Sequence, residues 1–112
     1  MKLLISGDFF IADEFSNSKL IDKSVVELLD QSDFRIVNLE APITKNNPNN
    51  KIIKTGPHLR MSEETAIKHL NELNIDCVTM ANNHILDYGV EGVNDTFGIL
   101  SNNNISYVGA GE

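Results

Sequence analysis

Short apolar stretches alternate with helix-like repeats along this chain. Four stretches are nearly continuous in apolar residues, which is typical of strands buried on both faces of a parallel sheet. Between them, apolar residues recur every three or four positions, as on one side of a helix. This order predicts an α/β fold, with a layered, parallel-rich sheet, flanking helices and right-handed crossovers. The predicted strands cover residues 3–6, 34–38, 75–80 and 105–108, and the helical repeats cover 21–29, 66–73 and 90–100.

Local signals place some element boundaries more closely. Ser62 is expected to cap the second helix. Asp87 is expected to cap a helix over residues 88–102, and His69 is expected to face solvent. Residues 41–60 form one long irregular segment, and loops of this length in a small domain are usually functional or mobile.

Composition and charge narrow the function classes. The chain has 112 residues, which favours a single domain. Nine Lys plus Arg against sixteen Asp plus Glu give a net charge of −7, which argues against a nucleic-acid-binding surface and against docking on anionic lipid. No apolar stretch approaches the ~20 residues of a membrane span, and no signal peptide is recognisable, so the chain as given is predicted to be cytoplasmic. Cys77 is alone, which excludes an intrachain disulfide and a cysteine-based zinc site and indicates a buried structural thiol.

Polar residues follow three of the predicted strands. Asp8 follows the first, Glu40 the second, and Asn82, Asn83 and His84 the third. The carboxyl ends of parallel strands meet at one edge, where ligands of open α/β sheets bind, so these side chains are expected to converge. Two carboxylates, an amide and an imidazole suit Mn²⁺, Zn²⁺, Fe or Mg²⁺. A divalent cation would offset the repulsion between the carboxylates and lower the pKa of a bound water.

Plainer interpretations stay open beside these. The carboxylates also fit ordinary turn and loop positions, and Asn82 is expected to satisfy backbone groups at a strand-to-helix turn. His58 and Arg60, in the long segment, are candidates to contact an anionic substrate or are ordinary loop residues. The turn of Gly109, Ala110 and Gly111 is a candidate phosphate cradle, although no helix follows it.

One motif points to a known family. The run Ala-Asn-Asn-His-x-x-Asp-x-Gly at residues 81–89 resembles the signature of the CapA family, capsule and poly-γ-glutamate biosynthesis proteins with a calcineurin-like metallophosphoesterase fold. The Gly-Asp pair at 7–8, the Asn-Leu-Glu-Ala-Pro-Ile segment at 38–43 and the Gly-Pro-His-Leu-Arg segment at 56–60 resemble that family too. The likeness therefore covers essentially the whole chain.

The resemblance implies roles for individual residues. It implies a cofactor of divalent metal ions (Mn, Zn or Fe) and an anionic substrate, phosphorylated or of polyglutamate type. The reaction implied is hydrolysis or transfer at a phosphoryl centre during capsule or poly-γ-glutamate production. The implied assignments are Asp8, Glu40 and Asn83 as metal ligands, His84 as proton donor or phosphate-orienting group, and Asn82, His58 and Arg60 as substrate contacts.

Two departures from the family keep alternatives open. Phe10 stands two residues after Asp8, where metallophosphoesterases commonly have a histidine. This favours a second hypothesis, a non-catalytic binding or assembly module that retains the fold. A third hypothesis is an α/β domain without metal that holds an anion at the glycine turn.

The second departure is length. The family extends well past residue 112, so residues 1–112 are expected to be one incomplete domain, the N-terminal half of an αββα sandwich, inactive alone. Such a half exposes an apolar sheet face, and we expect a homodimer or a missing C-terminal half to cover it. Members of the family can be membrane-anchored, although this chain is expected to contain no span.

Overall fold

A single parallel sheet organises the molecule. The computed structural model describes residues 1–110. Four strands stand in chain order, β1-β2-β3-β4, and each neighbouring pair is parallel. The predicted α/β class, with a parallel sheet and flanking helices, is confirmed. The elements are β1 (Leu3–Phe9), η1 (Asp13–Phe15), α1 (Lys23–Asp30), β2 (Phe34–Leu39), η2 (Pro48–Asn50), α2 (Glu63–Glu72), β3 (Cys77–Thr79), α3 (Gly89–Asn102) and β4 (Ser106–Val108).

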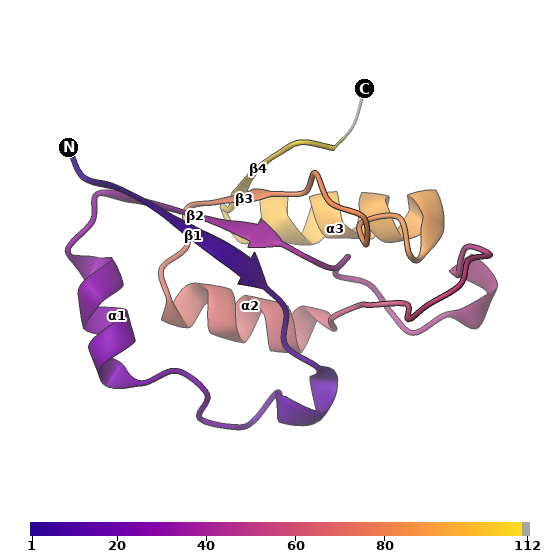
Figure 1. The fold of residues 1–112 in the computed structure, drawn as a ribbon, viewed down its shortest axis with the longest axis horizontal. Helices are drawn as coiled ribbons and strands as arrows, with labels where there is room; N and C mark the ends of the chain where they lie inside the picture. The colour runs from indigo at the N-terminus through magenta and orange to yellow at the C-terminus, as the bar shows by residue number, and fades with distance from the viewer. Residues whose placement is uncertain (111–112) are drawn as a thin grey trace.

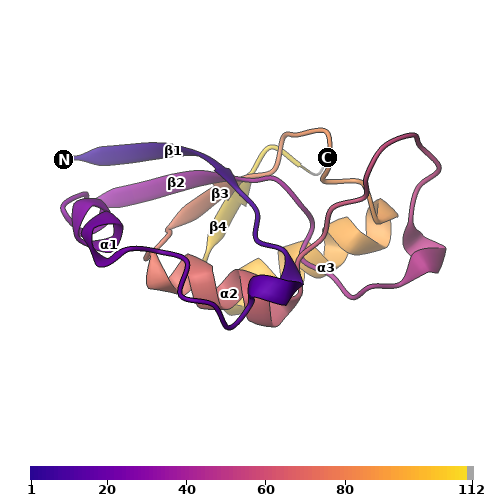
Figure 2. The ribbon, with the colours of Figure 1, turned by 60° about the horizontal axis from the view of Figure 1, so that its bottom comes forward.

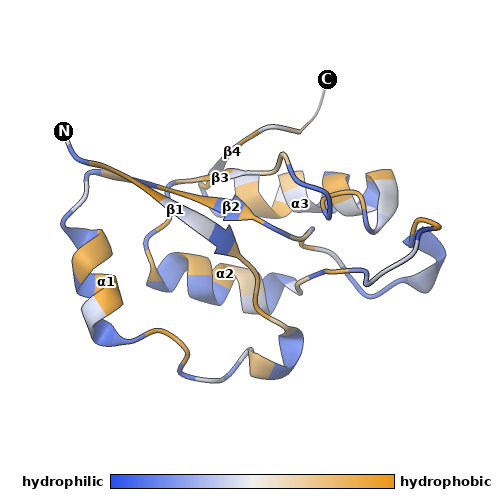
Figure 3. Cartoon of the chain, in the orientation of Figure 1, coloured by the Kyte–Doolittle hydropathy of each residue, from blue (hydrophilic) through white to orange (hydrophobic). Residues whose placement is uncertain are grey.

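The three α-helices of residues 1–110 lie on one side of the sheet, and none of them lies on the other side (Figures 1 and 2). On the covered side Val37 stands opposite Val78, and both are buried. On the open side Ile5 stands opposite Ile36, and Ile5 is 72% exposed. Figure 3 shows β1 changing from hydrophobic at its start to hydrophilic at its tip. The open side is therefore apolar over the body of the sheet and polar where the strands end.

The core fills the space between the covered side of the sheet and helices α2 and α3. Tyr107 of β4 stacks on Phe97 of α3, with ring centroids 4.7 Å apart. Cys77 is buried, as predicted for a structural thiol, and burial raises its pKa. None of the helices in residues 1–110 combines the length and the hydrophobicity that crossing a bilayer requires. The fully buried side chains include Leu39, Ile43, Met61, Ala66, Leu70, Val78, Met80 and Leu100.

His69 is fully buried on the inner side of α2, so the prediction that it faces solvent is wrong. Its Nδ1 lies 2.9 Å from the carbonyl oxygen of Thr65, one turn earlier. Lys68, the preceding residue, is exposed and reaches the carbonyl oxygen of Ser16 at 2.8 Å. Neighbours on a helix point about 100° apart, so a residue between a lysine and a leucine fits either side.

The predicted helix starts differ in outcome. Ser62 caps α2 as expected, because its side chain accepts a hydrogen bond from the backbone N–H of Thr65 at 3.2 Å. The prediction for α3 is wrong, because the capping position is Tyr88 and no side chain bonds the helix start. The carboxylate of Asp87 is instead engaged outside the helix, as described below.

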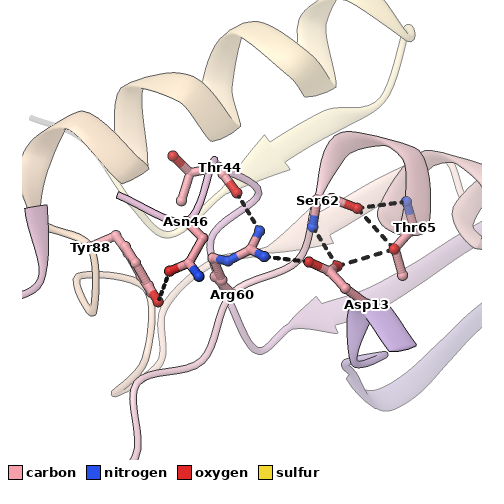
Figure 4. A network of polar contacts seen from close by, with 7 residues as sticks. All are labelled: Asp13, Thr44, Asn46, Arg60, Ser62, Thr65 and Tyr88. Carbon is pink, nitrogen blue, oxygen red and sulfur yellow. Dashed lines mark hydrogen bonds and ion pairs between the residues drawn. The ribbon is translucent and has the colours of Figure 1, made fainter. Parts of the chain in front are cut away.

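Asp13, a partly buried aspartate, links the segment after β1 to the start of α2 (Figure 4). Asp13 accepts hydrogen bonds from the backbone N–H of Ser62 at 2.8 Å and the hydroxyl of Thr65 at 3.1 Å, and it pairs with Arg60. Burial alone would raise the pKa of Asp13. The backbone hydrogen bond of Ser62, the charge of Arg60 and the Thr65 hydroxyl outweigh it and hold the pKa below its ordinary value.

Candidate functional site

The ends of the first three strands are joined by one amide side chain. Asn38 of β2 stands in register with Asp8 of β1 and with Thr79 of β3. Its Nδ2 donates to Asp8 Oδ1 at 2.6 Å. Its Oδ1 accepts from the hydroxyl of Thr79 at 3.1 Å and from Nδ2 of Asn82 at 3.2 Å. Asn38 thus joins the strand ends at the carboxyl edge of the sheet. It lies 30 positions from Asp8 and 44 positions from Asn82 in the sequence.

Asn82 shapes the turn that follows β3. Its Nδ2 donates to the carbonyl oxygen of Leu39 at 2.7 Å, and its Oδ1 accepts from the backbone N–H of His84 at 3.1 Å. The expectation that it satisfies backbone groups at a strand-to-helix turn is confirmed. Gly109, with a φ of +90°, packs against this turn, and a Cβ there would lie 2.9 Å from Cβ of Ala81. Only glycine fits that close approach.

Glu40, which follows β2 at this edge, has a raised pKa. Partial burial and the charge of Asp8 raise the pKa of Glu40, while His84 acts in the opposite direction. The backbone continues the sheet up to this point, since the N–H of Glu40 donates to the carbonyl oxygen of Phe9 at 3.1 Å. Two carboxylates from neighbouring strands therefore repel each other without a full counter-charge.

This donor set fits a divalent cation in its chemistry but is incomplete in number. Carboxylate and amide oxygens with an imidazole nearby suit a borderline or hard cation. Within residues 1–110, however, no group of three or more His, Cys, Asp or Glu side chains is arranged to hold a metal ion. Asn83 is exposed and makes no hydrogen bond to that part of the chain. Its role as a ligand stays a prediction, and further ligands would have to come from water or from polypeptide outside the described residues.

A buried aspartate holds the imidazole of His84. The Nδ1 atom lies 2.7 Å from Oδ2 of Asp87, which is fully buried. The same carboxylate accepts the backbone N–H of Leu59 at 2.7 Å and pairs with Lys54. Burial alone would raise the pKa of Asp87, but these three partners outweigh it and hold the pKa below its ordinary value.

The protonation of the imidazole follows from this partner. An ionised carboxylate only accepts hydrogen bonds, so the bond assigns a proton to Nδ1 of His84. Nε2 makes no hydrogen bond within the described part of the chain, and the His84 side chain is 15% exposed. His84 therefore presents one ring nitrogen, Nε2, that has no partner within residues 1–110.

Sequence reasoning missed two residues of this arrangement. Asn38 has no role in the sequence-based prediction, although an amide inside an otherwise apolar strand is itself a signal of a polar contact. Asp87 was interpreted as a helix cap. Its position three residues after His84 also fits a side-chain pair within one turn, and that alternative is the one the structure has.

The substrate residues predicted in the long segment have partners within the chain. His58 Nε2 lies 2.7 Å from the carbonyl oxygen of Ile52. Arg60 donates to the carbonyl oxygen of Thr44 at 2.9 Å and pairs with Asp13 (Figure 4). Their contact with a substrate stays a prediction. The proposed glycine cradle includes Gly111, which lies outside the described residues.

Comparison with known proteins gives consistent matches. A family described as bacterial capsule synthesis protein PGA_cap matches residues 2–112. The PGA biosynthesis protein CapA of Bacillus subtilis (strain 168) is 39% identical over 80 residues, which cover 71% of this chain and 20% of the relative. The capsule biosynthesis protein CapA of Bacillus anthracis is 34% identical over 91 residues, which cover 80% of this chain and 22% of the relative. The chain thus spans about a fifth of the length of these curated relatives.

Proposed function

Because this chain belongs to the PGA_cap family of bacterial capsule synthesis proteins, we propose that its strand-end cluster is part of a metal-dependent site that acts on a phosphoryl group. The observation that carries the proposal is the hydrogen-bonded network at the strand ends, in which Asn38 links Asp8 to Asn82 and Asn82 accepts the backbone N–H of His84. Glu40 follows β2 at the same edge, and Asp8 helps to raise its pKa. Such uncompensated repulsion is characteristic of carboxylates that receive a cation. The proposed biological setting is capsule or poly-γ-glutamate biosynthesis, as the names of the relatives suggest.

In this proposal each side chain has a separate task. Asp8, Glu40 and Asn83 would hold the cation, which supplies Lewis-acid activation of a phosphoryl group when it is bound. His84 would exchange a proton with the reacting oxygen through Nε2, because Nδ1 is committed to Asp87. Asn82, His58 and Arg60 are the proposed contacts to an anionic substrate.

Metal binding tests the site directly. We expect Mn²⁺ or Zn²⁺ to bind weakly to the 112-residue chain, and Asp8→Ala or Asn83→Ala to abolish the binding, as measured by isothermal titration calorimetry. Glu14→Ala is the matched control, because Glu14 is an exposed carboxylate on η1 away from the strand ends. Equal affinity in the wild type, Asp8→Ala and Asn83→Ala would refute the site.

A non-catalytic binding or assembly module is the second candidate. Phe10, where the resemblance leads us to expect a histidine, and the incomplete set of ligands in residues 1–110 favour it. Hydrolysis of a generic aryl phosphate with Mn²⁺ separates the two candidates, provided that a full-length form is tested beside the 112-residue chain. Activity of the long form that is lost in His84→Ala would exclude the binding module.

The open apolar side of the sheet bears on the partner. Leu3 and Ile5 of β1 are 54% and 72% exposed on it, and Phe34, the partner of Leu3 on β2, is 37% exposed. Neighbouring exposed apolar side chains of this kind are uncommon on soluble monomers. We propose that a second copy or further polypeptide of the same protein covers it, and analytical ultracentrifugation of the 112-residue chain distinguishes a dimer from a monomer.

A further inference from the structure

The long segment between β2 and α2 differs in charge from the rest of the molecule. Residues 41–62 contain four of the nine Lys and Arg residues and no Asp or Glu, in a chain with a net charge of −7. The ends of the segment are fastened together. The N–H of Thr44 donates to the carbonyl oxygen of Met61 at 3.0 Å, and the N–H of Met61 donates to that of Pro42 at 3.0 Å. The residues between them therefore form a closed basic loop, 45–60.

This basic loop lies against the start of α3 (Figure 1). Asn50 donates to Glu91 Oε2 at 2.9 Å. Lys51 stands over the ring of Tyr88, with Nζ 5.8 Å from the centroid. Gly89 has a φ of +68°, and a Cβ there would lie 3.2 Å from the carbonyl oxygen of Asn50. Close packing at several points thus holds the loop beside the turn that carries His84.

Three further contacts attach the loop to Asp87. Its backbone carbonyl accepts the N–H of Ile52 at 3.1 Å. Its Oδ1 pairs with Lys54, and its Oδ2 accepts both the N–H of Leu59 and Nδ1 of His84, each at 2.7 Å. With both oxygens engaged, the carboxylate has one orientation. Three of the four residues that contact Asp87 through its carboxylate or its backbone carbonyl belong to the basic loop.

We propose that Lys54 is a positioning residue for His84, acting through Asp87. Lys54 fixes Oδ1 of the buried carboxylate, and this directs Oδ2 at Nδ1 of His84, so that Nε2 stays the free nitrogen beside the strand ends. Lys54 is suited to this task because its side chain is 22% exposed and its ammonium group faces a fully buried acceptor. The functional part of this inference rests on the proposed role of His84. The coupling itself is a property of the fold.

Nuclear magnetic resonance of the ¹⁵N-labelled 112-residue chain tests the coupling without a substrate. We expect Lys54→Met to shift the imidazole nitrogen signals of His84 and to accelerate amide exchange at Ile52 and Leu59 by about tenfold, since the opening of these hydrogen bonds becomes easier. Lys54→Arg should restore most of the wild-type signals. The imidazole of His69, which bonds to Thr65 inside α2, should not change and serves as an internal reference.

Lys45→Met is the matched control, because Lys45 is an exposed lysine of the same loop. His84 signals that shift equally in Lys45→Met and Lys54→Met, or in neither, would overturn the proposal. If Lys54→Met does not fold, the position of the ring proton of His84 in the wild type tests the proposal instead. A neutral His84 ring with its proton on Nε2 would contradict the proposed arrangement, and a proton on Nδ1 with a slowly exchanging Lys54 ammonium group would support it.

The outcomes separate this inference from the proposed function. If the wild type binds no metal but Lys54→Met shows the expected shifts of the His84 signals, the metal site is refuted and the coupling is kept. Metal binding at the strand ends with unchanged His84 signals in Lys54→Met would refute the coupling and keep the site.

Discussion

Two pairs of carboxylates in this small chain behave in opposite ways. Asp13 and Asp87 are surrounded by donors of their own chain, and each has a lowered pKa. Asp8 and Glu40, at the strand ends, face each other, and the pKa of Glu40 is raised. Asp13 and Asp87 are thus satisfied by donors of the chain, while Glu40 at the carboxyl edge of the sheet faces the like charge of Asp8, which His84 offsets only in part.

This difference between the two pairs of carboxylates indicates which of them would be stabilised by a bound cation. An ion pair with hydrogen bonds to its remaining atoms is complete and serves to fix two segments to each other. Two like charges held together by β-strands store unfavourable energy, which only protonation or a cation relieves. The presence or absence of donors around a carboxylate therefore distinguishes carboxylates that fix the fold from candidate metal ligands. Four predictions test it.

The largest effect is expected for Asp87→Ala. The variant removes the partner of Lys54 and leaves the N–H of Leu59 and the imidazole of His84 without their acceptor. Breaking a buried pair in this way costs about 3 kcal/mol of unfolding free energy, measured by urea denaturation. Asp22→Ala is the control, since Asp22 is an exposed helix cap whose loss should cost clearly less than the loss of a buried pair. Equal losses in the two variants would contradict the assignment of Asp87 as a buried centre.

Asp13→Ala is expected to cost somewhat less, about 2 kcal/mol, because Arg60 and the N–H of Ser62 lose a charged acceptor that is partly exposed to water. The neighbouring Glu14 is exposed, so Glu14→Ala should stay within about 0.5 kcal/mol of the wild type. Chemical denaturation of both variants under one buffer condition provides the comparison. An Asp13→Ala loss as small as that of Glu14→Ala would mean that the network in Figure 4 adds nothing to stability.

The pH dependence should follow the lowered pKa of Asp13. A carboxyl with a lowered pKa in the folded state stabilises the fold above its unfolded pKa of about 3.9, and this contribution is lost as the pH falls through the folded value. The difference in stability between wild type and Asp13→Asn should therefore shrink as the pH falls from about 5 through the lowered pKa of Asp13. Thermal melts at a series of pH values measure it. A difference that grows as the pH falls would have the wrong sign.

The smallest effect should come from relieving the repulsion at the strand ends. The raised pKa of Glu40 means that the fold favours its neutral form, so this contribution is present at acid pH and is lost as the pH rises through the folded value. At pH 7 without metal, Glu40→Gln should be more stable than the wild type by about 0.5 kcal/mol, and Glu14→Gln should be unchanged. Mn²⁺ should reverse the order, because it would stabilise only the chain that binds it. Destabilisation by Glu40→Gln in the absence of metal would contradict the comparison.

Much of the fold could be predicted from local pattern, and the errors have physical causes. The four strands and three helices were expected near their observed positions, and Ser62 was expected to cap α2, because apolar spacing and a hydroxyl before a helix act over a few residues. His69 was misplaced because its helical neighbours are one polar and one apolar residue. The role of Asp87 was misjudged because a helix-capping position and a side-chain pair with His84 look the same in sequence.

Part of the candidate site was also accessible from the sequence. Asp8, Glu40 and His84 were expected together because the carboxyl ends of parallel strands share an edge. The linking role of Asn38 was not expected, since it depends on which strand stands between the other two. Arg60 was expected to meet a substrate, and its pairing with Asp13, 47 positions away, could not be read from either segment alone.

The amino-acid sequence by itself determined the α/β class, the strand-end carboxylates and the family, because each is written in spacing and motif over short stretches of chain. Tertiary structure alone decided which charges are satisfied. Lys54 meets Asp87 across 33 positions, and no donor of the described chain fully compensates the pair formed by Asp8 and Glu40. Electrostatic energy depends on distance in space and on exclusion of water, and neither is fixed until the chain has folded.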